Sequence, residues 1–420
     1  MSISRRRKVR YDKSMLSLFK TIAPTLRFGA RSFVCLELGE KMWRATALHT
    51  RDESISKVDS SIYPQIASGL ERAIPRPPNN QVHEALTYLL TPFTRFSYPE
   101  VAVLGDGRIV ATRCTSTALL RELANEPISE SELENSIAQG VWKAAMHEQS
   151  HFSRDLRIPE LEVAIANANI EQIRLDGHRV KNPIGFPART IELTLRLTSM
   201  SKTLLQEIRR VLPEDRIFIL EEAGMLMARA HLDLASGHDL LFVFIDEQET
   251  SFFEKTETAG HSLDVVKWGY GMLYVALGRA FGISYEEAKA VLRSFCYGAL
   301  SADLFQFIRK LLDEECGTLR QAILSRKTIP RERIVLLPLY EFPASLMPPY
   351  ASSWRRFGEA IRVIDNESIG EHFGFRLNLQ EEATRARLLS GLMAVVAFEK
   401  DDQERIFGRI AKQRARWLNK

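Results

Sequence analysis

The most informative segment of the chain reads Leu175-Asp176-Gly177-His178-Arg179-Val180-Lys181-Asn182-Pro183-Ile184-Gly185-Phe186. Its Asp-Gly and Asn-Pro pairs each favour a tight turn, and Gly185 adds a third flexible point. Directly afterwards, residues 190–198 alternate polar and apolar side chains with period two. That alternation predicts a strand with one buried face. The sequence therefore predicts two turns around a short basic segment, followed by a half-buried strand.

Composition indicates an ordinary globular protein. Of 420 residues, 45% are hydrophobic and 26% are charged, which is enough for two or more domains around a substantial core. The 57 basic and 53 acidic residues leave a net charge of only +4. A polycationic nucleic-acid-binding protein is therefore not expected, although basic residues gather at both ends of the chain.

Cysteine spacing and hydropathy bear on the cellular setting. No two cysteines form a CxxC pair, so neither a zinc ribbon nor a disulfide framework is predicted, and a reducing cytoplasm is the simplest setting. No run of about 18 apolar residues occurs, so we expect no transmembrane helix. Lys20 and Pro24 interrupt the apolar residues 16–26, and we therefore expect no secretory signal.

Two segments of the chain open in the same way, with a strand, a turn and a returning strand. The first begins at Phe33 and the second at Leu240, and helices and further strands follow each in mixed order. Such an order indicates an α/β or α+β protein. Ser129 and Ser284 each precede a Glu three residues later, which predicts two capped helix starts.

Some local assignments are less regular. Residues 50–80 are polar and are expected to form a loop, and residues 263–281 are expected to form one long apolar helix. Four phenylalanines of the second half are expected to lie in its core: Phe281, Phe295, Phe305 and Phe307.

These segments together resemble FtsA, the actin-like membrane anchor of bacterial cell division. In that family a strand ends in a Val-Asp-Gly type turn, an Asn-Pro-hydrophobic-Gly segment follows, and a strand rich in Leu, Glu and Val comes next. Residues 221–228 and 266–289 are also similar to segments of the family. PilM, a related anchor of the type IV pilus machinery, is the alternative. The resemblance implies an α/β, actin-like ATPase fold of two ribonuclease-H-like lobes with an FtsA-type extra subdomain.

The resemblance also implies a division of the chain. A basic N-terminal arm spans 1–30, the first lobe spans 31–97 and 200–238, and the extra subdomain spans 98–199. The second lobe spans 239–400, with a helical subdomain at about 281–333, and a basic amphipathic C-terminal helix spans 401–420.

In the family, ATP and Mg²⁺ are held between the two turns. The candidate cofactor-binding residues here are Gly39, Lys41, Asp246, Thr250, Gly269 and Gly271. Asp246 equally suits a plain turn at the end of a strand. The family's Asp is replaced by Glu37, and Glu40, Glu247 and Glu249 would add negative charge beside a polyphosphate, which is costly. Residues 338–343 also replace a Gly-Gly pair with bulkier residues. We therefore predict that ATP binding is weakened or lost, with at most a weak or lost ATPase activity.

Residues 403–420 are predicted to form a basic amphipathic helix. The candidate membrane-binding residues are Ile406, Phe407, Arg409, Ile410, Arg416, Trp417 and Leu418. Aliphatic and Trp side chains on one face, with basic side chains elsewhere, favour the surface of an anionic bilayer. A terminal helix packed on the body of the protein is the alternative.

Residues 147–151 match the HExxH pattern of zinc peptidases. On a helix, His147 and His151 share one face, and Glu148 would activate a zinc-bound water. Glu160, Glu162 or Glu171 would have to supply the third ligand. An exposed polar helix end explains the same residues, and we keep a zinc metallopeptidase only as the less favoured alternative, with no metal expected.

The resemblance thus implies a cytoplasmic scaffold, peripheral on the inner face of the cell membrane. Its partners would be the C-terminal peptide of an FtsZ-like filament protein, docked on residues 281–333, and an anionic membrane surface. The family also implies self-association.

Overall fold

The computed structural model describes most of the chain. The described residues are 32–40, 42–51, 65–94, 100–213, 216–232, 240–245, 248–255, 260–326, 334–338, 343–346, 361–363, 376–378, 392 and 406–418. Lys41 and Asp246 lie outside these residues, as do the basic N-terminal arm and most of 338–343.

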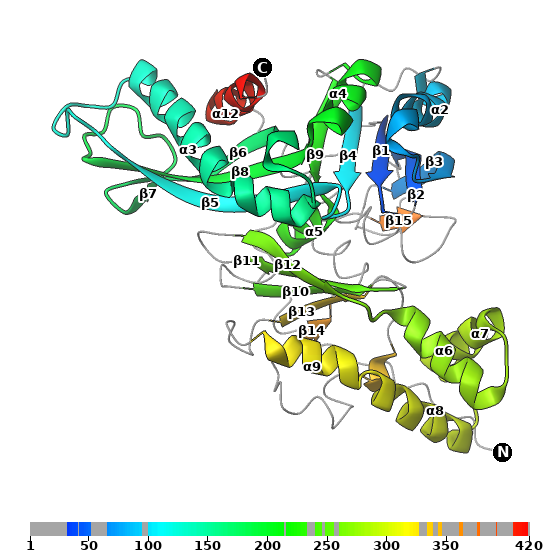
Figure 1. The fold of residues 1–420 in the computed structure, drawn as a ribbon. Coiled ribbons are helices and arrows are strands. Elements are labelled where there is room, and N and C mark those ends of the chain that lie inside the picture. Colours follow the sequence, from blue (N-terminus) through cyan, green and yellow to red (C-terminus); the bar gives the residue numbers. More distant parts are fainter. Residues whose placement is uncertain are drawn as a thin grey trace, which may run out of the picture.

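The first lobe is built on a six-stranded sheet with the order β15-β3-β2-β1-β4-β9 (Figure 1). At its centre, β1 (Ser32–Leu38) runs antiparallel to β2 (Met42–Arg51) and parallel to β4 (Glu100–Gly105). The outer strands are β3 (Gln65–Pro75), β9 (Ile217–Glu222) and β15 (Arg376–Asn378). β3 lies within the residues expected to be a loop, so that expectation was wrong for 65–75.

Alternate residues of β1 supply two different cores. Phe33 and Cys35 face the cluster between the two sheets, whereas Val34 and Leu36 join the cluster on the other side of the sheet. Because successive side chains of a strand point to opposite faces, this continuous apolar strand must be covered on both sides. The covering helices are α2 (Val82–Thr94) and α4 (Lys202–Val211) outside, and α5 (Ala223–Leu232) between the sheets.

The second lobe repeats this arrangement. β10 (Leu240–Ile245) is central, antiparallel to β11 (Thr250–Lys255) and parallel to β13 (Ile334–Pro338). β12 (Gly260–Val266) and β14 (Ile361–Val363) flank these strands. The order β12-β11-β10-β13-β14 therefore matches β3-β2-β1-β4-β9 strand for strand, with the same directions. This duplication defines two ribonuclease-H-like lobes and confirms the predicted α/β, actin-like ATPase fold.

Four helices cover the outer face of the second sheet. They are α6 (Tyr270–Phe281), α7 (Tyr285–Cys296), α8 (Ala302–Glu315) and α9 (Gly317–Ser325). The predicted capping box at Ser284 and Glu287 is confirmed. The expected helix over 263–281 was wrong at its start. Residues 263–266 belong to β12, which pairs with β11, and a turn at Trp268-Gly269 separates this strand from α6.

A further unit is inserted in the first lobe between β4 and β9. It comprises β5 (Val110–Leu120), α3 (Glu130–Leu156), β6 (Val163–Leu175), β7 (His178–Val180) and β8 (Thr190–Ser201). We call it the inserted unit. β5 also meets β12 at a single bridge between Cys114 and Gly260, which joins the inserted unit to the second sheet.

The predicted turns and cap of the inserted unit are in place. Asp176 and Gly177 adopt positive φ at the turn between β6 and β7, and Gly185 does so in the next turn. Ser129 caps α3 as predicted, accepting a hydrogen bond from the amide of Glu132. The strand predicted from the alternation at 190–198 is β8, whose apolar face is fully buried at Ile191, Leu193, Leu195 and Leu197. The expectation of a single buried face was wrong, because Thr194, Arg196 and Thr198 on the other face are buried as well.

The last described helix is α12 (Ile406–Trp417), which packs against β6 and α3 of the inserted unit. Short 3-10 turns complete the described structure: η1 (Asn79–Gln81), η2 (Glu160–Glu162) and η6 (Ala344–Leu346). No helix in the described part of the chain has both the length and the hydropathy needed to cross a bilayer.

Candidate functional site: the cleft between the lobes

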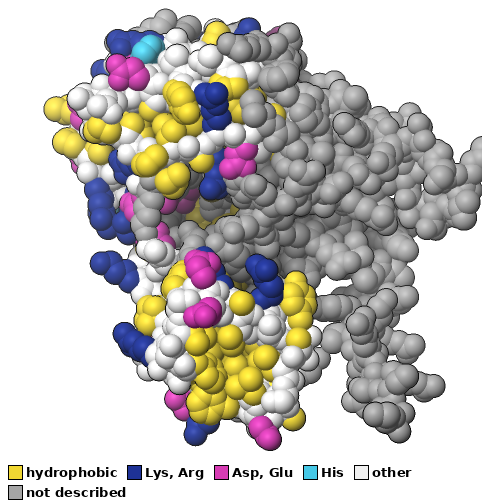
Figure 2. All heavy atoms as spheres, turned by 90° about the vertical axis from the view of Figure 1, so that its right-hand side faces the viewer, with side chains coloured by type: hydrophobic (Ala, Val, Ile, Leu, Met, Phe, Trp, Pro, Cys, Tyr) yellow, Lys and Arg dark blue, Asp and Glu magenta, His cyan; other side chains and the backbone are white. Residues whose placement is uncertain are grey.

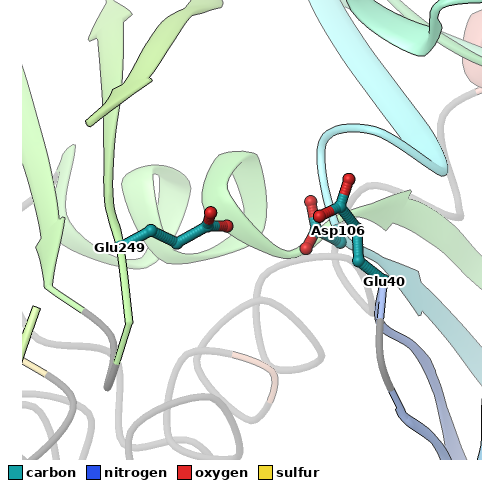
Figure 3. A group of neighbouring side chains, drawn as sticks. All are labelled: Glu40, Asp106 and Glu249. Carbon is teal, nitrogen blue, oxygen red and sulfur yellow. The ribbon is translucent and has the colours of Figure 1, made fainter. Parts of the chain in front are cut away.

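Three carboxylates meet where the two lobes face each other. Glu40 follows β1, Asp106 follows β4, and Glu249 precedes β11 of the second lobe, with one oxygen from each within 4.8 Å of the others. In Figure 3, Glu249 extends towards Glu40 and Asp106 from the opposite lobe. The parallel pairing of β1 and β4 brings Glu40 and Asp106 together, because the carboxyl ends of both strands reach the same edge of the sheet.

Arg108 partly neutralises this cluster. Its guanidinium donates to both oxygens of Glu40, at 3.0 and 3.1 Å. The backbone amide of Arg108 donates to Asp106 Oδ1 at 3.2 Å, and the amide of Asp106 donates to the carbonyl of Leu38 at 3.0 Å. The turn after β4 is therefore tied to the turn after β1.

Gly39 serves the hairpin between β1 and β2. Its amide donates to the carbonyl oxygen of Met42 at 3.0 Å, and a Cβ at this position would lie 2.7 Å from that oxygen. Glycine is therefore required for the chain to close tightly there. An amide engaged in this way is not available to a phosphate oxygen.

Thr250 has a similar internal role in the second lobe. It is fully buried, and its hydroxyl donates to the carbonyl of Trp268 at 2.7 Å. This bond ties β11 to the segment that opens α6, where Gly269 precedes the helix and Gly271 lies in its first turn. The structure thus brings Thr250, Gly269 and Gly271 into one region, while Gly39 lies on the opposite lobe.

The described residues of the cleft fit a hard cation better than a polyphosphate. Carboxylate oxygens are the preferred ligands of Mg²⁺ and Ca²⁺. Phosphates instead need convergent backbone amides and positive charge, whereas among the described residues three carboxylates converge, Arg108 pairs with Glu40, and the amide of Gly39 is already bonded. Weakened or lost ATP binding stays a prediction, and we derive no catalytic step through a nucleotide.

Sequence reasoning identified Glu40 and Glu249 but missed Asp106 and Arg108. The local signal was an Asp-Gly turn, Asp106-Gly107, directly after the buried strand of residues 101–105. Its position beside Glu40 follows only from the pairing of strands that are distant in sequence.

Glu148 of the HExxH pattern is already engaged by other side chains. Glu148 is buried and accepts a hydrogen bond from Arg113 Nε at 2.9 Å, while His147 Nδ1 lies 3.0 Å from its other oxygen. Burial alone would raise the pKa of Glu148, but the bond to His147 and the charge of Arg113 outweigh it and lower that pKa. Glu171 pairs with Arg196, and within the described residues only the cleft cluster gathers three potential ligands. A zinc peptidase therefore lacks support from the geometry.

The C-terminal helix lies on the body of the protein. Phe407 and Ile410 pack against the core of the inserted unit, and Ala411 and Ala415 are fully buried there. Leu418 is exposed. The side chains of the other predicted membrane residues, Ile406, Arg409, Arg416 and Trp417, lie outside the described part.

A second feature is an exposed aromatic surface on the helices of the second lobe. Figure 2 shows hydrophobic side chains gathered on this part of the molecule. We define the aromatic patch by Phe281 at the end of α6 and Phe307 on α8; Met272, Tyr285 and Tyr297 are further exposed side chains of this helical region. Phe281 and Phe307 meet edge to face, with ring centroids 5.7 Å apart. Both were expected in the core. That was wrong, because the core of these helices is filled by Phe295 and its partly buried neighbour Phe305.

Strand order and the inserted unit together define the class: the chain has the actin-like ATPase fold. No protein-family model matches the sequence, and no curated protein matches it.

Among solved structures, the chain is similar to a PilM–PilN type IV pilus biogenesis complex, with 15% identity and a TM-score of 0.44 over 86% of this chain and 98% of that chain. It is also similar to MreB5 of Spiroplasma citri bound to ADP, with 10% identity and a TM-score of 0.36 over 89% and 99% of the two chains. A third similar structure is the ethanolamine utilization protein EutJ from Carboxydothermus hydrogenoformans, with 10% identity and a TM-score of 0.33 over 90% and 96%.

Proposed function

We propose that this protein is an actin-like scaffold that tethers a filament of the FtsZ type to the inner face of the cytoplasmic membrane. In this proposal it binds a short peptide of the filament protein on the helices of its second lobe, and it has at most weak ATPase activity. The observation that carries the proposal is the aromatic patch, since Phe281 and Phe307 are 37% and 55% exposed although their rings meet edge to face.

Exposed aromatic pairs of this kind suit protein recognition. Aromatic side chains and Met are enriched at the centres of interfaces, and a few such residues usually supply most of the binding free energy. The patch lies on rigid elements, because α7 has a complete capping box and α6 ends at a left-handed Gly282. A preformed surface lowers the entropy cost of binding a flexible peptide.

The partner peptide is best tested with a matched pair of variants. We expect Phe307→Ala to weaken binding of an FtsZ C-terminal peptide at least tenfold, which corresponds to about 1.4 kcal/mol of lost contact. Trp142→Ala is the control, because Trp142 is a similarly exposed aromatic residue (54%) on α3, outside the patch. Fluorescence anisotropy of a labelled peptide measures both affinities. Equal affinities for the two variants, or no binding by the unmodified protein, would contradict the proposed docking surface.

The cleft leads to a second expectation. Mg-ATP should not raise the melting temperature, because the amide of Gly39 and the hydroxyl of Thr250 are already engaged and three carboxylates face the phosphate position. Titration calorimetry with Mg-ATP and with Mg²⁺ alone separates the two ligands. A micromolar affinity for Mg-ATP would overturn this account of the cleft.

The membrane part of the proposal concerns α12. Its sequence carries apolar side chains on one face and several basic ones elsewhere, a combination that favours an anionic bilayer surface. In the structure α12 packs against β6 and α3, so it would have to leave this position to enter a membrane.

A further inference from the structure

Helix α12 completes the inserted unit. α3 packs on β5 and β8, and α12 packs beside α3 on β6. Figure 1 shows α12 next to α3 on the same side of this sheet. The core of the inserted unit accordingly includes Ala168 of β6, Val141 of α3, and Ala411 and Ala415 of α12. The C-terminal helix therefore covers apolar surface that would otherwise face water.

One stripe of α12 makes this contact. The residues of this stripe recur at helical spacing: Phe407, Ile410, Ala411 and Ala415. The two alanines belong to the core of the inserted unit, and Phe407 and Ile410 pack against it. Phe407 and Ile410 of this stripe are also among the residues predicted to contact the membrane, whereas Leu418, another of those residues, is exposed. A bilayer and the inserted unit therefore compete for Phe407 and Ile410.

Among the described side chains of α12, the small Ala411 and Ala415 are fully buried, whereas the larger Phe407 and Ile410 are only partly buried. Apolar stabilisation grows with the area removed from water, so two methyl groups contribute little. A bilayer would bury Phe407 and Ile410 further and would attract the basic side chains of the helix.

We propose that α12 is a reversible latch that is either docked on the inserted unit or inserted in an anionic membrane, and never both. This inference rests on the proposed membrane association. When α12 binds the membrane, the apolar face of β6 is uncovered. Conversely, any interaction that stabilises the docked state of α12 weakens the binding of the protein to the membrane. A ligand shifts such an equilibrium only by binding one state better, which the bilayer does here.

Thiol labelling measures the latch directly. Ala168→Cys places a thiol on the covered face of β6 in an otherwise full-length chain with Cys296→Ser, because Cys296 is the partly exposed native cysteine. We expect vesicles of phosphatidylglycerol and phosphatidylcholine to raise its labelling rate about tenfold, as the covering helix leaves. Removing residues 406–420 should give the fast rate without vesicles, and pure phosphatidylcholine should have little effect.

Ala111→Cys is the matched control. Ala111 is also buried in the core of the inserted unit, but it lies on β5, which α3 covers. Its labelling should not respond to vesicles. If Ala168→Cys fails to fold, Ala145→Cys on α3 provides a second buried position in the same core.

Co-sedimentation in the same samples separates two failures. If the vesicles sediment the protein but leave the labelling of Ala168→Cys unchanged, the latch is wrong while membrane association stands. If the truncated chain sediments as well as the full chain, the membrane contact lies elsewhere and the latch is again wrong. If nothing sediments, the proposed membrane association is itself wrong, and the latch falls with it.

Discussion

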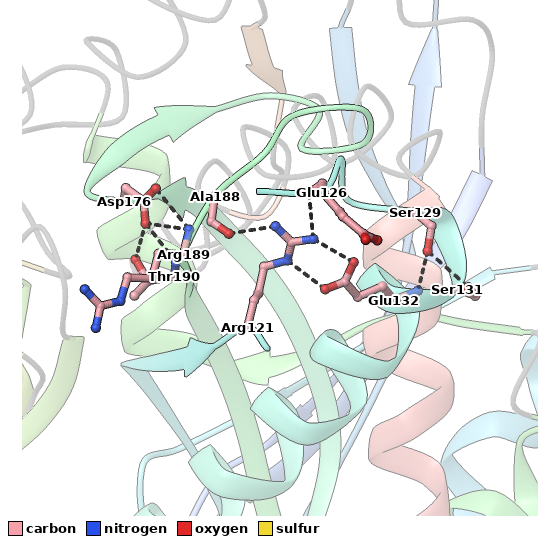
Figure 4. Close-up of polar contacts among 9 residues, drawn as sticks. All are labelled: Arg121, Glu126, Ser129, Ser131, Glu132, Asp176, Ala188, Arg189 and Thr190. Atoms are coloured by element: carbon pink, nitrogen blue, oxygen red, sulfur yellow. Dashed lines mark hydrogen bonds and ion pairs between the residues drawn. The ribbon is translucent and has the colours of Figure 1, made fainter. Parts of the chain in front are cut away.

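Arg121→Leu is expected to lower the free energy of unfolding by about 2–3 kcal/mol, because it leaves two carbonyl oxygens without their donor, while the carboxylate of Glu132, whose side chain is 34% exposed, stays partly solvated. Arg121 is only 2% exposed at the end of β5. Its guanidinium donates to both carboxylate oxygens of Glu132, at 2.7 and 2.9 Å, and to the carbonyl oxygens of Ala188 and Glu126, at 2.6 and 3.0 Å (Figure 4). Leu would leave all these acceptors without their donor.

The network matters because it holds together three segments that are distant in sequence. Arg121 joins the end of β5 to the start of α3 and to the segment before β8, and Asp176 accepts hydrogen bonds from the amides of Arg189 and Thr190 nearby (Figure 4). Its loss should open the far end of the inserted unit before the rest of the protein unfolds. Urea unfolding gives the free energy, and hydrogen exchange of residues 121–128 and 183–189 locates the change.

Arg189→Leu is the control for this prediction. Arg189 is exposed, and its hydrogen bonds to Asp176 and to the amide of Arg121 use its backbone, which the substitution keeps. Its effect should stay within about 0.5 kcal/mol, as for most surface substitutions. Similar losses for the two variants would show that the Arg121 network contributes little.

The stability that this network contributes should also depend on pH. The hydrogen bond and charge of Arg121 lower the pKa of Glu132 below its ordinary value. A carboxyl whose folded pKa is lowered contributes stability above its unfolded pKa, and this contribution is lost as the pH falls through the folded value. Acid should therefore reduce the difference between Arg121→Leu and the unmodified protein.

The sequence was sufficient for features that depend on a few neighbouring residues. The helix caps at Ser129 and Ser284, the turn at Asp176-Gly177 and the existence of strand β8 with its buried apolar face all follow from local chemistry, and the structure has each of them. The repeated strand-turn-strand openings at Phe33 and Leu240 were also enough to predict two similar lobes.

Features that depend on the pairing of strands far apart in the sequence could not be predicted from neighbouring residues. Residues 65–75 contain Ser68 and Gly69 and read as a loop, yet pairing with β2 makes them a strand. Asp106 joins the cleft only because β4 lies parallel to β1. The apolar stripe of α12 suits a membrane and a protein core equally well, so periodicity alone cannot choose between them.

The second prediction of large effect concerns Glu222, at the junction of the first lobe and the inserted unit. Glu222 ends β9 and is 4% exposed. Its Oε2 accepts a hydrogen bond from the amide of Thr112 in β5 at 2.8 Å, and its own amide donates to the Thr112 hydroxyl at 3.1 Å. Burial raises the pKa of Glu222 to about 8, while the bond from Thr112 acts in the opposite direction.

Nearby charges add to this effect of burial. Asp155, Asp106 and Glu221 all lie close enough to raise the pKa of Glu222 further. Two of these carboxylates have cationic partners of their own, since Arg113 pairs with Asp155 and Arg229 pairs with Glu221. Glu222 has no such ion pair among the described contacts, so the folded state prefers its neutral acid form.

The sign of the pH effect follows from the raised pKa. Below the ordinary pKa of Glu the acid is protonated in both the folded and unfolded states, and its contribution to stability is fully present. As the pH rises towards about 8, only the unfolded state gains by releasing the proton, so stability is lost across this window. Glu222→Gln removes that loss, because Gln keeps an oxygen for the amide of Thr112 and never ionises.

We therefore expect Glu222→Gln to match the unmodified protein below the ordinary pKa of Glu, at about pH 4, and to exceed it at alkaline pH by roughly 2–3 kcal/mol, since each pKa unit corresponds to about 1.4 kcal/mol and relaxation reduces the full value. Urea unfolding at a series of pH values measures the difference. Glu132→Gln is the control, because the pKa of Glu132 is lowered and its substitution should cost stability at alkaline pH. A constant difference between Glu222→Gln and the unmodified protein at every pH would show that Glu222 is already ionised in the folded state. The junction between β9 and β5 would then be held by a buried charge and not by a neutral acid.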